Sequence, residues 1–316
     1  AIGQSPDEVN LADRAGLLSK CDLTSEMVGE FPELQGYMGG QYASRGGEPA
    51  AVCEAIAESY MPRFAGDALP SAGTATAVAM ADKLDTLAGV FGVGQAPTGD
   101  KDPYALRRAA LGVLRMIIEG ELDVDLRPLV AAAVGEYGEQ FDRDKVTDEV
   151  VAFMMERLRP YFMEREVPAE VFAAVQARHP TKPHDFARRV QAVDAFRQRP
   201  EAASLAAANK RIQNILRQVD TQVPPQVDES LLKEDAEWNL AAKLIGIGPR
   251  VSQLLKGGEY AEALTHLAGL RDTIDEFFDT VMVMDEDAQL RGNRLALLRN
   301  LGALFSETAD ISLLHG

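Results

Sequence analysis

Residues 99–121 read GDKDPYALRRAALGVLRMIIEGE and contain the clearest helix signals in the chain. Asp102 can accept hydrogen bonds from the free amides of a first helical turn, and Pro103 suits the first helical position. The apolar side chains that follow are spaced to share one helical face: Leu106, Ala110, Val113 and Ile117. Gly120 is a suitable stop. The stretch therefore predicts an amphipathic helix that begins at Pro103 and ends near Gly120.

The same helical period continues along nearly the whole chain, and the alternation typical of strands is almost absent, so the sequence predicts an all-α, multi-domain protein. Proline and glycine gather at 61–73, 92–103, 179–184, 223–226 and 256–258. The break at 179–184 marks the preferred start of a C-terminal domain. Beyond it, the pattern predicts a bundle of helices at 185–199, 201–218, 231–245, 259–283 and 288–305.

Composition places the chain among soluble globular proteins. It has 316 residues, 46% hydrophobic and 26% charged, which suits two or three domains. The sequence contains no apolar run of about 18 residues and no signal-peptide pattern at its start. We therefore expect a cytoplasmic protein that has no membrane partner.

The two cysteines, Cys21 and Cys53, lack the neighbours of a zinc site and are interpreted as reduced core thiols. The sequence begins at Ala1 without an initiator methionine, close to the start of a helical pattern. We expect a fragment of a longer protein whose N-terminal part is missing.

The formal net charge of −17 argues against a protein covered in nucleic acid. Positive charge is nevertheless concentrated between Arg178 and Arg217, where nine Lys or Arg side chains accompany three acidic ones. Within this basic segment, Lys210, Asn214 and Arg217 share one helical face with Arg211 beside them. Binding of an anionic ligand and a solvated helix face are both open interpretations.

The run ADKLDTL (81–87) resembles the last metal-ligand segment of HD-type phosphohydrolases. Asp82 and Asp85 are its carboxylates. Such a site needs imidazole ligands as well, and the four histidines all follow Asp82 in the sequence: His179, His184, His266 and His315. The sequence therefore predicts an HD-like remnant without a metal, in which Asp82 caps a helix or forms a salt bridge.

The glycines of 92–108 suggest a phosphate-binding loop, although no strand precedes them and no nucleotide fingerprint is present. An interdomain loop tied by Asp100, Lys101 and Asp102 is the alternative. No catalytic triad or carboxylate pair is evident, so no catalytic residue is assigned and the chain alone is not expected to be an enzyme.

Four long segments, 17–39, 79–115, 206–217 and 274–310, resemble the β subunit of the bacterial two-subunit glycyl-tRNA synthetases. The resemblance implies an HD-like helical domain at 1–118, a helical connector at 119–184 and a DALR-type anticodon-binding bundle at 185–316. It also implies a hetero-oligomer, α2β2, in which the β subunit binds tRNA(Gly). Glycine activation with ATP and Mg would occur on the α subunit, and this chain would hold no cofactor. Asp100 and Cys21 depart from the usual Ser and Ala of the family.

On this resemblance, Lys210, Arg211 and Arg217 are expected to contact tRNA phosphates, and Asn214 to contact an unstacked base. Further candidates on the helix at 288–305 are Arg291, Asn293 and Arg294. Two other functions remain open. One is an HD-type metal-dependent phosphohydrolase, and the other is a structural scaffold that docks the α subunit through 1–118.

Overall fold

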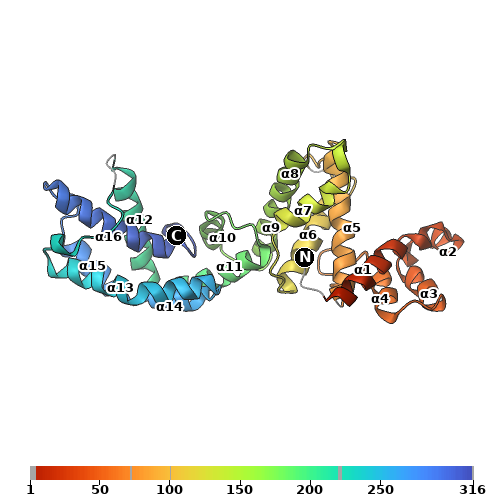
Figure 1. The fold of residues 1–316 in the computed structure, drawn as a ribbon, viewed down its shortest axis with the longest axis horizontal. Helices are drawn as coiled ribbons and strands as arrows, with labels where there is room; N and C mark the ends of the chain where they lie inside the picture. Colours follow the sequence, from red (N-terminus) through yellow and green to blue (C-terminus); the bar gives the residue numbers. More distant parts are fainter. Residues whose placement is uncertain (1–4, 72, 100, 220–222, 315–316) are drawn as a thin grey trace. The chain divides into compact units, whose positions relative to one another are not determined.

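The computed structural model describes residues 5–71, 73–99, 101–219 and 223–314 (Figure 1). Within these ranges every regular element is an α-helix or a 3-10 helix, and the only strand-like pairing is the isolated bridge between Thr98 and Lys101. The predicted all-α fold is confirmed. The chain divides into unit 1, residues 1–161 with 181–184, and unit 2, residues 162–180 with 185–316.

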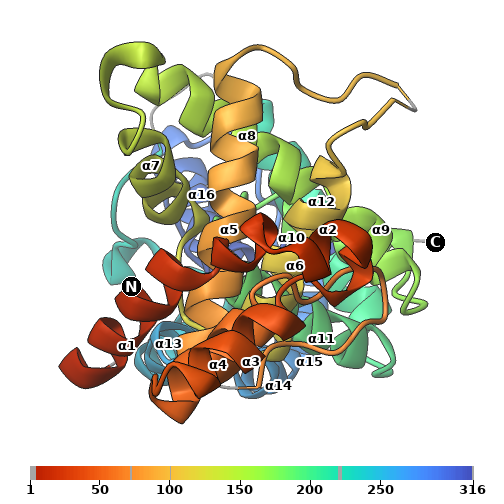
Figure 2. The same cartoon turned by 90° about the vertical axis from the view of Figure 1, so that its right-hand side faces the viewer.

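Unit 1 is organised around one long helix, α5. The helices of this unit are α1 (Pro6–Leu18), α2 (Glu26–Glu30), α3 (Tyr37–Arg45), α4 (Ala50–Glu58), α5 (Gly73–Gly92), α6 (Leu106–Glu119), α7 (Leu126–Gly135) and α8 (Arg143–Glu156), with 3-10 turns at Cys21–Thr24, Pro32–Leu34 and Gly138–Gln140. Helix α5 packs against α1, α4, α6, α7 and α8 and is visible as the long central helix in Figure 2. Leu87 and Ala88 on this helix are fully buried, as expected for a helix enclosed by others.

Helix α6 confirms the predicted apolar face but begins three residues later than predicted. Leu106, Ala110, Val113 and Ile117 are all fully buried. Before them, residues 103 and 104 form a turn, and Ala105 adopts the left-handed conformation with φ of 55°. The Asp102 carboxylate spans this turn and accepts hydrogen bonds from the amides of Leu106 (2.8 Å) and Arg107 (3.0 Å). Asp102 thus caps the helix as predicted, from four residues before its first turn.

Replacing Asp102 with alanine should lower the free energy of unfolding by about 1–2 kcal/mol, because two helix amides lose their acceptor. Asp102→Asn is the matched control, since its amide oxygen can still accept one of the two bonds. Urea unfolding followed by far-UV circular dichroism measures both. A smaller loss for alanine than for asparagine would contradict this account of the cap.

Unit 2 contains the predicted bundle. Its helices are α10 (Ala169–Gln176), α11 (Pro183–Arg197, in this unit from Asp185), α12 (Ala202–Arg217), α13 (Asp235–Lys256), α14 (Tyr260–Ala268), α15 (Arg271–Thr280) and α16 (Ala288–Ser306), with 3-10 turns at Glu229–Leu231 and Ile311–Leu313; α9 (Leu158–Met163) crosses the division between the units. Helix α13 packs against α14, α15 and α16, while α12 packs against α15, α16 and the last 3-10 turn. Phe277 and Phe305 are fully buried in this unit.

Two predicted helices of unit 2 differ from the structure. The helix predicted at 231–245 instead runs from Asp235 to Lys256, through Pro249. Val251 and Leu254 beyond the proline are buried, so packing outweighs the one backbone hydrogen bond that proline removes. The helix predicted at 259–283 is interrupted after Ala268, where Gly269 caps α14 before α15 begins.

The structure also divides the chain differently from the three predicted parts. The start of the predicted bundle at 185 coincides with the main part of unit 2. The connector predicted at 119–184 is not a separate body, because residues 119–161 belong to unit 1 and 162–180 belong to unit 2. Helices α7 and α8, which it would contain, pack against α5 of the predicted HD-like domain.

None of the helices described by the structure combines the length and apolar character needed to cross a bilayer. Cys21 is exposed and Cys53 is half-buried, so the prediction that both are core thiols is wrong. Cys21 opens a short 3-10 turn at the surface rather than a buried helix face.

Candidate functional site

The basic segment contains two kinds of cation, which the sequence alone does not separate. On α11 and just after it, the arginines are held by neighbouring groups. Arg189 donates to Asp185 (2.7 Å) and to the backbone oxygen of Thr308 (2.8 Å), and its guanidinium lies 4.3 Å from the centre of the Tyr260 ring. Arg197 is paired with Asp194. These side chains fix the bundle and have little charge left to offer a ligand.

The cations of α12 are exposed and have no acidic partner among the described residues. Lys210, Arg211, Asn214 and Arg217 all lie on the solvent face of the helix, as predicted. The Arg211 guanidinium stacks 4.2 Å from the centre of the Phe278 ring, which holds it in place without neutralising it. Arg217 donates to the Gln213 side chain (3.3 Å). The four residues are called the α12 surface below.

Packing inside the unit sets the direction of the α12 surface. Leu205, Ala208 and Ile212 on the opposite face are buried, and Ile215 is half-buried. Gln213 donates to Asp310 (2.8 Å), which ties the helix to the C-terminal 3-10 turn. A rigid helix therefore presents three cations and one amide to solvent, an arrangement that can bind several phosphates along one strand.

The candidates on α16 have a different role. Asn293 is 2% exposed, and its side chain exchanges two hydrogen bonds with the backbone of Asp228, at 2.7 and 2.9 Å. Arg294 is 3% exposed and fully engaged inside the unit. Contact of these two side chains with RNA, as predicted from the sequence, does not fit their burial, and we omit them from the surface. Arg291 is half-buried and donates to the backbone oxygen of Asp285 (2.6 Å).

Arg294 lies at the centre of a buried ionic cluster. It donates to Glu237 (2.6 Å), to Asp285 (2.7 Å) and to the backbone oxygen of Met282 (2.8 Å). The other oxygen of Glu237 accepts from the amides of Lys233 (2.7 Å) and Glu234 (2.8 Å) and so caps α13. Burial raises the pKa of Glu237, but Arg294 and these amides outweigh it and hold the pKa below its usual value.

The two aspartates of the predicted HD-like remnant, Asp82 and Asp85, lie on α5 in unit 1. Asp82 forms a salt bridge with Lys20, as predicted, and Lys20 also lies 4.3 Å above the centre of the Tyr60 ring. Asp85 accepts a hydrogen bond from the Tyr137 hydroxyl (3.0 Å). Within the described part of the chain, no three His, Cys, Asp or Glu side chains gather to hold a metal. Asp100, part of the adjacent loop prediction, lies outside the described residues.

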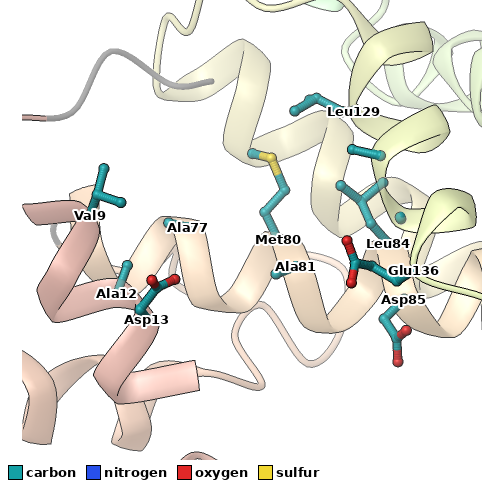
Figure 3. Close-up of a pocket in the computed structure, with 12 residues that line it drawn as sticks. Val9, Ala12, Asp13, Ala77, Met80, Ala81, Leu84, Asp85, Leu129 and Glu136 are labelled. Atoms are coloured by element: carbon teal, nitrogen blue, oxygen red, sulfur yellow. The ribbon is translucent and has the colours of Figure 1, made fainter. Parts of the chain in front are cut away.

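An apolar cavity of about 440 Å³ also opens in unit 1, between α1, α5 and α7 (Figure 3). Its apolar lining includes Met80 and Leu84 from α5 and Leu129 from α7. Carboxylates of Asp13, Asp85 and Glu136 also line it. This cavity could not be predicted from the sequence, because its walls come from helices that are far apart along the chain.

Two family models match the chain. The model of the DALR anticodon binding domain matches residues 205–311, which include the α12 surface. The model of the glycyl-tRNA synthetase beta subunit matches residues 2–177. The chain belongs to the glycyl-tRNA synthetase β-subunit family.

Curated relatives extend the match over almost the whole chain. The glycine–tRNA ligase beta subunit of Edwardsiella ictaluri is 54% identical over 308 residues, which cover 98% of this chain and 45% of the relative. That of Shewanella amazonensis is 51% identical over 314 residues, 99% of this chain and 45% of the relative. The chain thus spans about half the length of the curated relatives it matches.

Proposed function

We propose that this chain is the tRNA-binding part of a glycine–tRNA ligase β subunit. Its unit 2 would grip the anticodon stem and loop of tRNA(Gly), and ATP-dependent glycylation would take place on a separate cytoplasmic α subunit that holds ATP and Mg. The observation that carries the proposal is the α12 surface, with its unpaired cations inside the segment matched by the anticodon-binding model.

The residues of the α12 surface suit the phosphates and the bases of RNA. Lys210 and Arg217 are exposed and can pair with phosphates. Arg211 is preoriented by Phe278 and loses less side-chain entropy when it binds. Asn214 lies between them and offers both a donor and an acceptor to the edge of an unstacked base.

Removing two cations tests the proposal directly. The double variant Lys210→Ala/Arg217→Ala should weaken tRNA(Gly) binding by about tenfold per lost contact. The slope of log K against log salt should fall by roughly one for each lost phosphate contact. Lys243→Ala/Lys256→Ala removes the same charge from α13, where both lysines are exposed, and is the matched control. Filter binding at several salt concentrations measures all three proteins.

The same assay separates recognition from other functions. Asn214→Ala should reduce the preference for tRNA(Gly) over a non-cognate tRNA more than it reduces overall affinity, because a base contact carries sequence information. Equal binding of both tRNAs by the parent chain would refute specific recognition. Binding that is absent or insensitive to salt would favour the scaffold function instead.

A further inference from the structure

A second cavity of unit 1, about 460 Å³ in volume, has cationic walls. It lies where the start of the loop after α4, the middle of α5 and the start of α6 meet. Lys83 comes from α5, Arg63 from the loop and Arg108 from α6, so each segment contributes one cation. Nothing in the assignment of unit 2 to RNA binding involves this cavity.

Lys83 is the unusual member of the set, because its side chain is only 6% exposed. Its ammonium donates to the backbone oxygen of Tyr60 (3.1 Å), the one acceptor found for it among the described residues. An ammonium has three donors, and a buried charge with unused donors is costly unless an anion meets it. The cavity supplies the space for such an anion.

Helix α6 has a glycine, Gly112, at the point where the Lys83 side chain packs against it. A Cβ atom at Gly112 of α6 would lie 2.8 Å from Cε and 3.1 Å from Cδ of Lys83. Any larger residue at this position would push the lysine aside. The buried lysine is therefore accommodated by a glycine on the neighbouring helix.

The charges around the cavity leave a positive excess. Arg63 and Arg108 are exposed, and no ion pair or side-chain hydrogen bond holds either of them within the described ranges. The carboxylate of Asp82 is already neutralised by Lys20. Asp67, the other acid nearby, is occupied by the backbone amides of Arg63 (2.7 Å) and Ala68 (3.0 Å).

We propose that this cavity binds the phosphate group of a nucleotide, either free or within an RNA strand. Lys83 would meet the phosphate at the base of the cavity, and the guanidinium groups of Arg63 and Arg108 would each offer a planar fork to its oxygens. Tyr104 also lines the cavity and is 49% exposed, so its ring is available to stack on the attached base.

Binding of three probes to the full 316-residue chain tests this assignment. Inorganic phosphate, AMP and a single-stranded CCA trinucleotide are each titrated by calorimetry at low salt. Lys83→Met should weaken binding of the phosphate probe by about tenfold, and Arg63→Gln/Arg108→Gln by about tenfold per lost contact, because charged hydrogen bonds are lost. Arg45→Gln is the control, since Arg45 is exposed and has no ion pair with any residue that the structure describes, and it should change affinity by less than twofold.

The probes also identify the source of the phosphate. Competition between AMP and inorganic phosphate indicates a site for free nucleotides, whereas binding of the trinucleotide alone indicates a strand phosphate. The absence of binding by all three, or equal binding by the parent and both cavity variants, overturns the proposal. Lys210→Ala/Arg217→Ala should leave the effect of Lys83→Met on the AMP titration unchanged, so failure of this site and failure of the α12 surface are distinguishable.

Discussion

Replacing Arg294 with methionine should lower the free energy of unfolding of unit 2 by about 3–5 kcal/mol. Methionine fills similar space but leaves the Glu237 carboxylate, which is 0% exposed, without its cation. Asp285 loses a partner at the same time. Trp238, the only tryptophan of the chain, is adjacent to Glu237 on α13, so its fluorescence during urea unfolding reports the change.

Two further variants test whether the loss of stability comes from the buried Glu237 carboxylate that is left without its cation. Arg291→Met on the same helix breaks hydrogen bonds to backbone oxygens only and should cost about 1 kcal/mol or less. The double variant Arg294→Met/Glu237→Gln should recover most of the loss, because glutamine is neutral and its oxygen still caps the two amides of α13. Equal losses for Arg294→Met and Arg291→Met would show that the cluster is not the cause.

The dependence on pH has a definite sign. In the parent chain burial raises the pKa of Glu237, but Arg294 and the capping amides lower it below the usual 4.5. The stabilisation from Glu237 is thus present at neutral pH and is lost as the pH falls through its folded-state pKa. Without Arg294, the buried carboxyl group binds a proton more readily. The cost of Arg294→Met should therefore shrink as the pH is lowered toward 4.5.

The helices were largely predictable from sequence because their signals are local. Leu106 to Ile117 follow a 3.6-residue period, and their burial confirms the predicted face. The helix limits near Pro103 and Pro249 were predicted wrongly. In the first case a turn at residues 103 and 104 separates the Asp102 cap from the first helical residue. In the second, core packing beyond Pro249 overrules the local preference of proline.

The candidate α12 surface was predictable from the sequence because its geometry is local. Lys210, Asn214 and Arg217 lie on one face because they belong to one helix. Arg294, in contrast, was wrongly predicted to contact RNA. Its ionic partner Glu237 is 57 residues away in the sequence, so the buried pair could not be predicted. In the run ADKLDTL the sequence pattern pointed to the two aspartates. The structure shows instead that the lysine between them, Lys83, is the buried charged residue.

Replacing Lys83 with methionine should stabilise unit 1 near neutral pH, although it removes a side chain from the proposed phosphate site. Burial lowers the pKa of Lys83 from 10.5 to about 8, with Asp82 opposing this shift. A shift of this size corresponds to about 3 kcal/mol of cost for the charged form in the folded chain. Methionine keeps the apolar stem and loses one hydrogen bond to Tyr60, so the net gain at pH 7 should be about 1–3 kcal/mol.

The difference between Lys83→Met and the parent should depend on pH in one direction. Between about pH 8 and 10.5 the unfolded chain keeps the Lys83 proton while the folded chain releases it, so the parent becomes more stable relative to the variant as the pH rises. Trp238 belongs to unit 2, so its fluorescence does not report the unfolding of unit 1. The unfolding of unit 1 is therefore followed by far-UV circular dichroism. A variant that is less stable than the parent at pH 7, or a difference that is constant across this range, would show that Lys83 carries no burial penalty. A substitution that stabilises the chain but weakens phosphate binding would mean that this lysine is retained for its ligand at the expense of the fold.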